Sequence, residues 1–279
     1  TYANQYMELT GTMDVGRPHD SVVVGGSLPC SSCNRFYVKV TRYKIYIVLK
    51  GGNEMEDYPD ISVSRAAIIA GISLIIMAIL APIANFSILN RLIVPDNTAK
   101  TFSNITSSEV SFRIAILLFF IVAVLDIIVA WTLFIFLKPV NNSLSLLAAW
   151  FRVVYAVLLA VALFYLINVL QLMNVAEYLS SLETNQLQIQ VMISIKSFLA
   201  NWEFGLIFFG IHLTLLGYLI FKAGYMRKLL GTLLVIAGIG YLIDGFGKII
   251  SSDYSISIAI FTFIGEILLI FWLLISGHR

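Results

Sequence analysis

Six long apolar runs constrain this chain more than any other feature. Each run is close to the ~20 residues that a helix needs to cross the hydrocarbon core of a bilayer. In hydrocarbon every backbone N–H and C=O must find a partner within the segment, which favours helices over open strands. The sequence therefore predicts an all-α polytopic membrane protein, a bundle of six transmembrane helices. The expected spans are residues 66–89, 112–137, 146–171, 202–222, 229–250 and 256–276.

The composition agrees with this class. The chain is 59% hydrophobic and 12% charged, with a mean hydropathy of +0.91, which is too apolar for a soluble domain of this length. We therefore expect the lipid bilayer as a partner. No basic stripe with interleaved aromatic residues is present, so we do not expect nucleic-acid binding.

The first 54 residues differ from the rest. The stretch Phe36–Leu49 mixes aromatic, basic and β-branched residues, which is typical of a strand pair. Cys30 and Cys33 form a single C-x-x-C, which supplies two of the four ligands of a structural zinc site, and His19 is the one further candidate. One interpretation of residues 1–54 is therefore a small cytoplasmic segment.

A second interpretation explains the same residues without a folded domain. Lys50-Gly51-Gly52 can be encoded by a purine-rich run of the kind that binds bacterial ribosomes, and Met55 follows at a suitable distance. Such sequence must be set aside before fold reasoning. We prefer this interpretation: residues 1–54 are upstream sequence read in frame, and residues 55–279 form the six-helix transmembrane domain.

The distribution of Lys and Arg predicts the orientation. Seven of these residues lie near the span ends that we assign to the cytoplasmic face of the membrane. Five lie on the other face, in longer loops. Positive residues concentrate in short cytoplasmic loops, so both termini are expected in the cytoplasm. The seven are Arg65, Lys138, Arg152, Lys222, Arg227, Lys228 and Arg279, and the five are Arg91, Lys100, Arg113, Lys196 and Lys248.

Ionisable side chains inside the spans are the candidate functional residues. Asp126, His212 and Glu266 are expected near mid-membrane, Tyr241 near the same level, and Arg152 about two turns from the cytoplasmic end of its span. A charge at this depth costs roughly 2.5–3.5 kcal/mol on insertion scales, so each calls for an explanation.

Two explanations remain open for these residues. A histidine between two carboxylates could relay protons or bind a cation. Alternatively, each group is buried and satisfied by a neighbour, with Arg152 or His212 holding Asp126, and we prefer Arg152 because arginine is always charged. The spacing lacks H-x-x-x-H and H-E-x-x-H, so we expect no metal and no cofactor.

Glycines recur every seventh residue in two spans. Gly231, Gly238 and Gly245 make one stripe, and Gly210 and Gly217 make another. Small residues let transmembrane helices approach closely, so we expect these stripes at helix crossings. A ligand groove along the stripe is the alternative.

Local signals add three expectations. Asp96 or Asn97 should cap a short surface helix. Pro82 should kink the first span. Asn168 should make an interhelical hydrogen bond.

Nine short segments keep their order and spacing from about residue 60 to the C-terminus. Their ordered set resembles the bacterial "domain of unknown function 4386" family. The resemblance implies a six-pass protein of the bacterial cytoplasmic membrane without an assigned activity, and it supplies no catalytic residues. The segments are Arg65–Gly71, Ile93–Asp96, Phe112–Arg113, Leu137–Leu144, Ala149–Arg152, Phe208–His212, Leu216–Leu219, Gly238–Asp244 and Gly265–Glu266.

Three classes of function remain: a non-enzymatic permease or accessory protein, an intramembrane enzyme, and a sensor or stress-response component without chemistry. We favour a non-enzymatic membrane protein: a small-solute or ion permease, or an accessory or stress-related component, as a homo-oligomer or with a membrane partner. The alternative is an intramembrane enzyme acting on lipid through Asp126, His212 and Glu266. A permease should show interrupted helices and a repeat, and here Pro82 alone breaks a span.

Overall fold

The computed structural model divides the chain into two compact units, Thr1–Asp60 and Ile61–Arg279. The structure describes residues 22–26, 35–41, 44–50, 61–178, 184–224, 226, 228–251, 254, 258 and 264–276.

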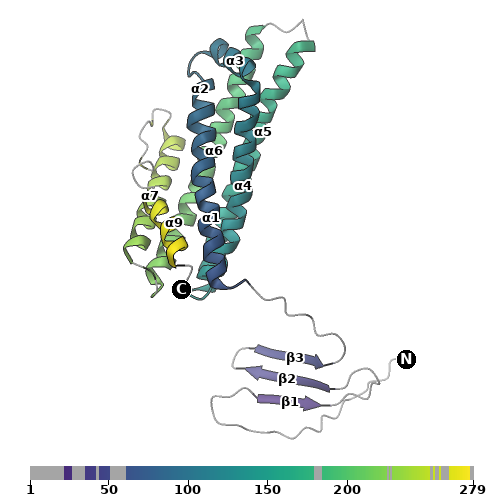
Figure 1. Ribbon diagram of the computed structural model, residues 1–279, viewed down its shortest axis with the longest axis vertical. Coiled ribbons are helices and arrows are strands. Elements are labelled where there is room, and N and C mark those ends of the chain that lie inside the picture. The colour runs from purple at the N-terminus through teal and green to yellow at the C-terminus, as the bar shows by residue number, and fades with distance from the viewer. Residues whose placement is uncertain are drawn as a thin grey trace, which may run out of the picture. The chain divides into compact units, whose positions relative to one another are not determined.

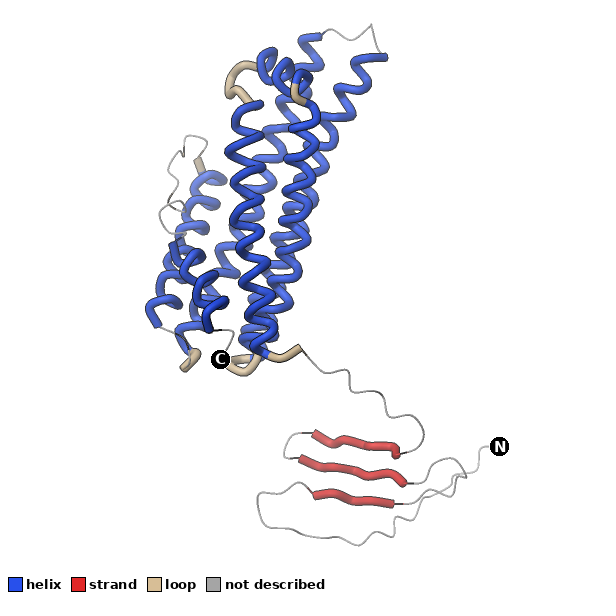
Figure 2. Tube along the Cα trace, in the orientation of Figure 1, coloured by secondary structure: helices blue, strands red, loops and turns tan. Residues whose placement is uncertain are grey.

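The first unit contains a three-stranded antiparallel sheet in the order β1-β2-β3 (Figure 2). The strand pair expected within Phe36–Leu49 is confirmed by β2 and β3, in which Tyr37 lies opposite Val48. The candidate zinc ligands, His19, Cys30 and Cys33, lie outside the described residues. The strands are β1 (Val22–Gly26), β2 (Arg35–Thr41) and β3 (Lys44–Lys50).

The second unit is a helical bundle (Figure 1). Five described helical stretches are long and apolar enough to cross a membrane, and α9 is a shorter apolar helix. The predicted all-α polytopic membrane class is therefore confirmed. The helices are α1 (Val63–Pro82), the π-helix η1 (Ile83–Leu89), α2 (Asn90–Leu92), α3 (Thr98–Ser107), α4 (Glu109–Leu137), α5 (Asn142–Tyr178), α6 (Thr184–Lys222), α7 (Lys228–Ile250) and α9 (Ile264–Ser276).

The first span changes its hydrogen-bonding pattern at Pro82. α1 ends there, and a π-helical segment continues to Leu89 before α2 completes a stretch of 30 residues. Proline has no N–H to donate to the carbonyl four residues earlier, so an α-helical bond is lost at this point. The π-helical segment begins at the next residue, Ile83.

The connection after the first span forms the expected surface helix. The Asn97 side chain accepts a hydrogen bond from the Lys100 N–H at 2.9 Å, which confirms a cap at the start of α3. Asp96 has φ of 65° and makes the turn before it. The Thr101 hydroxyl bonds both the N–H and the carbonyl of Val94, at 2.9 and 3.1 Å, and fastens α3 to the loop.

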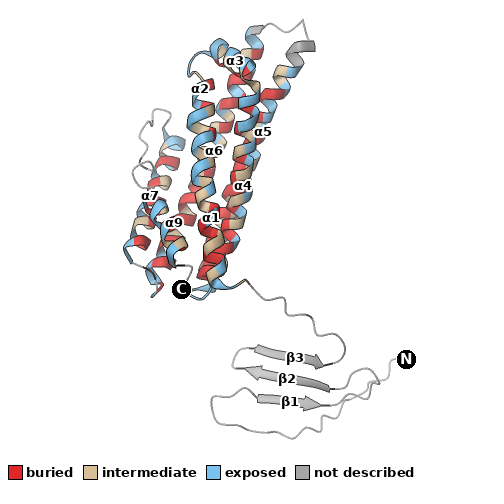
Figure 3. Ribbon diagram, viewed as in Figure 1, coloured by how far each residue is buried: buried red, intermediate tan, exposed pale blue. Residues whose placement is uncertain are grey.

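The interior of the bundle has two apolar clusters along its length. The first, which we call the six-helix half, contains buried residues of α1, α4, α5, α6, α7 and α9. Val129 on α4 and Leu273 on α9 are two of its members. The second, the four-helix half, draws on α4, α5, α6 and the first span, with Ile105 of α3. Buried residues gather where the helices meet (Figure 3). α5 and α6, at 37 and 39 residues, run through both halves.

Helices α6 and α7 meet backbone to backbone at two glycine pairs. A Cβ on Gly217 would lie 2.6 Å from the Gly231 carbonyl oxygen, and a Cβ on Gly231 would lie 2.6 Å from the Gly217 carbonyl oxygen. Gly210 and Gly238 form the second pair, where a Cβ on either would lie 2.8 or 2.6 Å from the other's carbonyl oxygen. Gly245 meets the Ile207 side chain instead. Any larger side chain at these pairs must push the helices apart.

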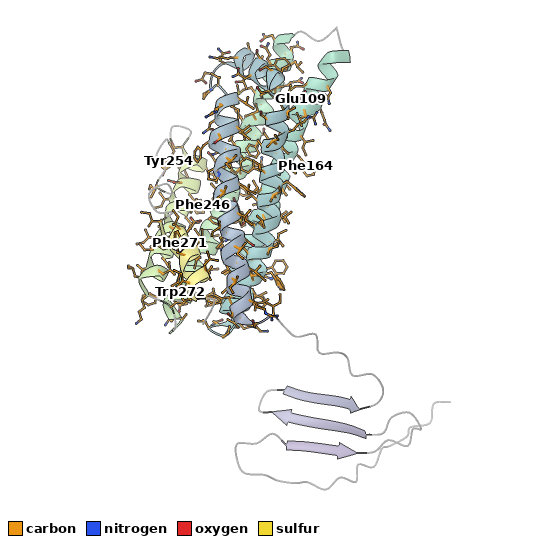
Figure 4. The ribbon with its side chains drawn as sticks, in the orientation of Figure 1. Glu109, Phe164, Phe246, Tyr254, Phe271 and Trp272 are labelled. Carbon is orange, nitrogen blue, oxygen red and sulfur yellow. The ribbon has the colours of Figure 1, made fainter. Side chains whose placement is uncertain are left out.

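The outside of the bundle is apolar. Phe164 and Phe271 are 67% and 57% exposed, and Phe246 is 50% exposed. Figure 4 shows these labelled side chains on different helices. Large exposed apolar side chains on many helices fit contact with lipid tails rather than water.

Candidate functional site

A buried ion pair lies inside the six-helix half. Nη2 of Arg152 on α5 is 2.7 Å from Oδ1 of Asp126 on α4, and the two side chains are 3% and 1% exposed. Arg152 lies about ten residues from the start of α5 and Asp126 about eleven from the end of α4, or roughly 15 Å along each helix. That is about half the thickness of a bilayer core.

His212 on α6 joins this pair. Its Nδ1 is 2.8 Å from the Ala148 carbonyl oxygen, and its Nε2 is 3.3 Å from Nη1 of Arg152. A carbonyl oxygen only accepts hydrogen bonds, so Nδ1 carries the hydrogen. Guanidinium nitrogens only donate, so Nε2 presents its lone pair to Arg152. The geometry therefore fixes a neutral histidine whose two ring nitrogens are both occupied.

An aromatic cluster lies beside the guanidinium. The Arg152 carbon Cζ lies 5.4 Å from the Phe209 ring centroid, which is a cation–π distance. The Phe209 ring also packs against Tyr155 at 5.0 Å and, edge to face, against Tyr241 at 5.3 Å. The Tyr155 hydroxyl accepts a hydrogen bond from Trp202 Nε1 at 3.3 Å. The charge is thus held in an apolar, aromatic surrounding.

A second carboxylate is hydrogen-bonded to this aromatic cluster. Glu266 is in the first turn of α9, and the Tyr241 hydroxyl of α7 donates a hydrogen bond to it. Glu266 interacts electrostatically with both Arg152 and Asp126. The site therefore combines residues from five helices around one arginine.

Several polar atoms in the site lack a hydrogen-bond partner among the described residues. They are both carboxylate oxygens of Asp126, Nε of Arg152 and Oε1 of Glu266. Oδ1 of Asp126 has the short ion-pair contact with Arg152 but no well-aligned hydrogen bond. Buried polar atoms without partners are few in native proteins and often mark a water or a ligand.

The cavity beside His212 is very small. Its volume is about 10 Å³, and it is lined by residues of α4, α5 and α6. This is near the lower limit for one water molecule. The lining residues are Ala130, Leu133, Phe134, Leu137, Ser145, Ala148, Ala149, His212 and Leu216.

The structure brings the predicted site residues together as two linked groups. Asp126, Arg152 and His212 form a chain of direct contacts. Tyr241 and Glu266 form a hydrogen-bonded pair that interacts with that chain electrostatically. Within the described part of the chain, no group of three or more His, Cys, Asp or Glu residues could hold a metal ion.

Sequence reasoning found Tyr241 but missed two other aromatic residues of the site, Phe209 and Tyr155. Phe209 lies three residues before His212, and Tyr155 lies three after Arg152, so each shares a helix face with a residue already singled out. That spacing was the available signal. The Ala148 carbonyl carried no signal, because any residue supplies the same oxygen.

Outside the site, Asn168 makes the interhelical bond that we expected. Its side-chain N–H donates to the Ser194 hydroxyl at 3.0 Å, from α5 to α6. The prediction is confirmed.

Comparisons with known proteins agree with the sequence resemblance. A family model described as "Domain of unknown function (DUF4386)" matches residues 69–277. A protein of Archaeoglobus fulgidus described as "Uncharacterized protein" is 36% identical over 160 residues, which cover 57% of this chain and 82% of that protein. No solved structure matches.

Proposed function

The chain belongs to the family described as Domain of unknown function (DUF4386), whose description names no activity, so we propose a function from the buried site. The protein is a non-enzymatic integral membrane protein that acts as a small-ion permease. The ion would pass by way of the carboxylates Asp126 and Glu266. We further propose that it resides in the cytoplasmic membrane of a bacterium with both termini in the cytoplasm, as the Lys and Arg distribution predicts.

One observation carries this proposal. Two carboxylates in the six-helix half, Asp126 and Glu266, interact with a single fixed positive charge, that of Arg152. Ionisable groups inside spans are rare and commonly line ion or proton pathways. One arginine balances one carboxylate, so the second leaves the site ready to bind a small cation.

The geometry favours a permease over a lipid-directed enzyme. A general base needs a free lone pair within reach of the substrate. Both ring nitrogens of His212 are occupied, by the Ala148 carbonyl and by Arg152. The ~10 Å³ cavity beside His212 has no space for part of a lipid.

A flux assay tests the proposed function. The full chain is reconstituted into vesicles that contain a pH-sensitive or Na⁺-sensitive dye, and a gradient of H⁺, Na⁺ or K⁺ is imposed. We expect one gradient to collapse at least tenfold faster than in protein-free vesicles, and Glu266→Gln to remove most of the difference. Glu109→Gln is the matched control, because Glu109 is an exposed carboxylate paired with Arg113 outside the site. Rates equal to protein-free vesicles for all three ions, with monodisperse protein, would reject the proposal.

A further inference from the structure

The charges around Glu266 do not balance. The ionisable residues that interact with this carboxylate come from α4, α5 and α7, and α1 contributes none between Arg65 and Arg91. Arg152 is the one permanent cation among them. The others are Asp126 on α4, Tyr155 on α5 and Tyr241 on α7. Beyond them, His212 on α6 interacts with Arg152, and Asp244 on α7 interacts with Tyr241.

The arginine is already engaged elsewhere. One terminal nitrogen of Arg152 contacts Asp126 at 2.7 Å, and the other donates to His212 at 3.3 Å. His212 cannot supply a second positive charge in this arrangement, because a hydrogen on Nε2 would point at the guanidinium. Glu266 therefore has an electrostatic interaction with Arg152 but no ion pair in the described residues.

The immediate contacts of Glu266 suit a neutral carboxylic acid. One oxygen accepts a hydrogen bond from the Tyr241 hydroxyl, while Oε1 is buried without a partner. A buried carboxylate without a cation is costly, and such a group becomes neutral by taking up a proton. An O–H on Oε1 would also leave the bond from Tyr241 unchanged.

We propose that Glu266 is the proton-binding site of this protein, held ready by Tyr241. A proton from bulk water forms an O–H bond on Oε1 and neutralises the carboxylate; release breaks that bond and returns the negative charge. This inference deepens the proposed permease function by naming the ion as H⁺ and its carrier as Glu266. Asp126 stays ionised and paired with Arg152 throughout.

Infrared difference spectroscopy tests this independently of flux. Purified full-length protein is titrated in detergent near neutral pH, and the C=O stretch of a protonated carboxylic acid is followed in H₂O and D₂O. We expect one such band that shifts in D₂O and is lost in Glu266→Gln. In Asp126→Asn the band should persist only to a lower pH, because Arg152 is then free to stabilise ionised Glu266. Glu203→Gln is the matched control, since Glu203 is a half-exposed carboxylate paired with Lys248 at 2.6 Å, and it should leave the band unchanged.

Other outcomes would overturn the proposal. A band lost in Asp126→Asn but kept in Glu266→Gln would place the proton on Asp126, and the absence of any band would mean that both carboxylates are ionised. If Glu266→Gln fails to fold, Tyr241→Phe provides a second test. Loss of the hydrogen bond from the Tyr241 hydroxyl should move the C=O band to higher frequency. A band that does not move would contradict the assignment of the proton to Glu266. A band with the expected behaviour but no ion flux would retain this site and reject the permease function.

Discussion

The two halves of the bundle are built from the same long helices but have different interiors. In the four-helix half, Phe119 packs edge to face on Phe198 and Trp202, and the polar contact between α5 and α6 is the neutral bond of Asn168. In the six-helix half, Arg152 is 2% exposed and pairs with a carboxylate. Charge is buried where α7 and α9 add to the packing.

The difference shows what burying an arginine requires in a membrane. A guanidinium has five donors and a permanent charge. Here a carboxylate, an imidazole and an aromatic ring, from α4 and α6, surround Arg152. The added helices α7 and α9 bring Tyr241 and Glu266 to the same level. Four helices with apolar interiors offer no such set.

Breaking the ion pair should have the largest effect. Arg152→Gln leaves Asp126 buried without its cation, which typically costs about 3–5 kcal/mol. Thermal unfolding in detergent should show a large loss of stability. Asp126→Asn should also destabilise, and the double variant should cost less than the sum of the two, because the residues are directly coupled. Additive effects would mean that the pair does not hold the six-helix half together.

Forcing apart the glycine contact should have the next largest effect. A Leu side chain at Gly238 would meet the Gly210 carbonyl at 2.6 Å and the Thr214 side chain, so α6 and α7 must separate. Overpacking of this kind typically costs 1–3 kcal/mol. Gly224→Leu is the matched control, since a Cβ there meets nothing within 4 Å. Equal melting temperatures for the two variants would contradict the close contact.

The neutral bond of the four-helix half should matter much less. Asn168→Ala removes the hydrogen bond to Ser194, and bonds of this kind average ~0.6 kcal/mol in a membrane protein. The Ser194 hydroxyl also donates to the Gln190 carbonyl at 3.0 Å, so it stays satisfied in the variant. A loss as large as that of Arg152→Gln would remove the contrast between the two halves.

The smallest expected effect on stability comes from removing a hydrogen bond of Tyr254, in the connection between α7 and α9. Partial burial and the hydrogen bond to Asp244 raise the pKa of Tyr254 above its ordinary value of 10.0. The Tyr254 hydroxyl donates to Oδ1 of Asp244 at 2.8 Å, and the Ile258 N–H donates to the same oxygen at 2.9 Å. Tyr254→Phe should lower the melting temperature slightly.

The pH dependence of that difference has a defined sign. Because the pKa is raised in the folded protein, the stabilisation by Tyr254 is fully present below pH ~10, where the phenol is protonated in both states. It is lost as the pH rises through the folded pKa. Melting curves of the native protein and Tyr254→Phe should therefore converge above pH ~10, and a constant difference would argue against the bond to Asp244.

The class of the protein and the level of its polar residues could be predicted from sequence. Apolar length alone identifies spans, and counting residues from the span ends puts Asp126, His212 and Glu266 near one depth. The cap at Asn97 was predictable because it depends only on neighbouring residues.

The contacts within the site could not be predicted, because they depend on how each helix is rotated about its axis. The spans are apolar on all sides, so their patterns do not say which face turns inward. The bond from His212 to the Ala148 carbonyl and the position of Phe209 below Arg152 follow from that rotation.

The paired glycines of α6 and α7 have a consequence for the order of assembly. Gly217 and Gly231 lie close together along the chain, and closing a short loop costs little conformational entropy. Their backbones touch without waiting for any side chain to be positioned. We therefore expect α6 and α7 to associate first as a hairpin after insertion, with the other helices gathering on it, and to separate last when the protein unfolds.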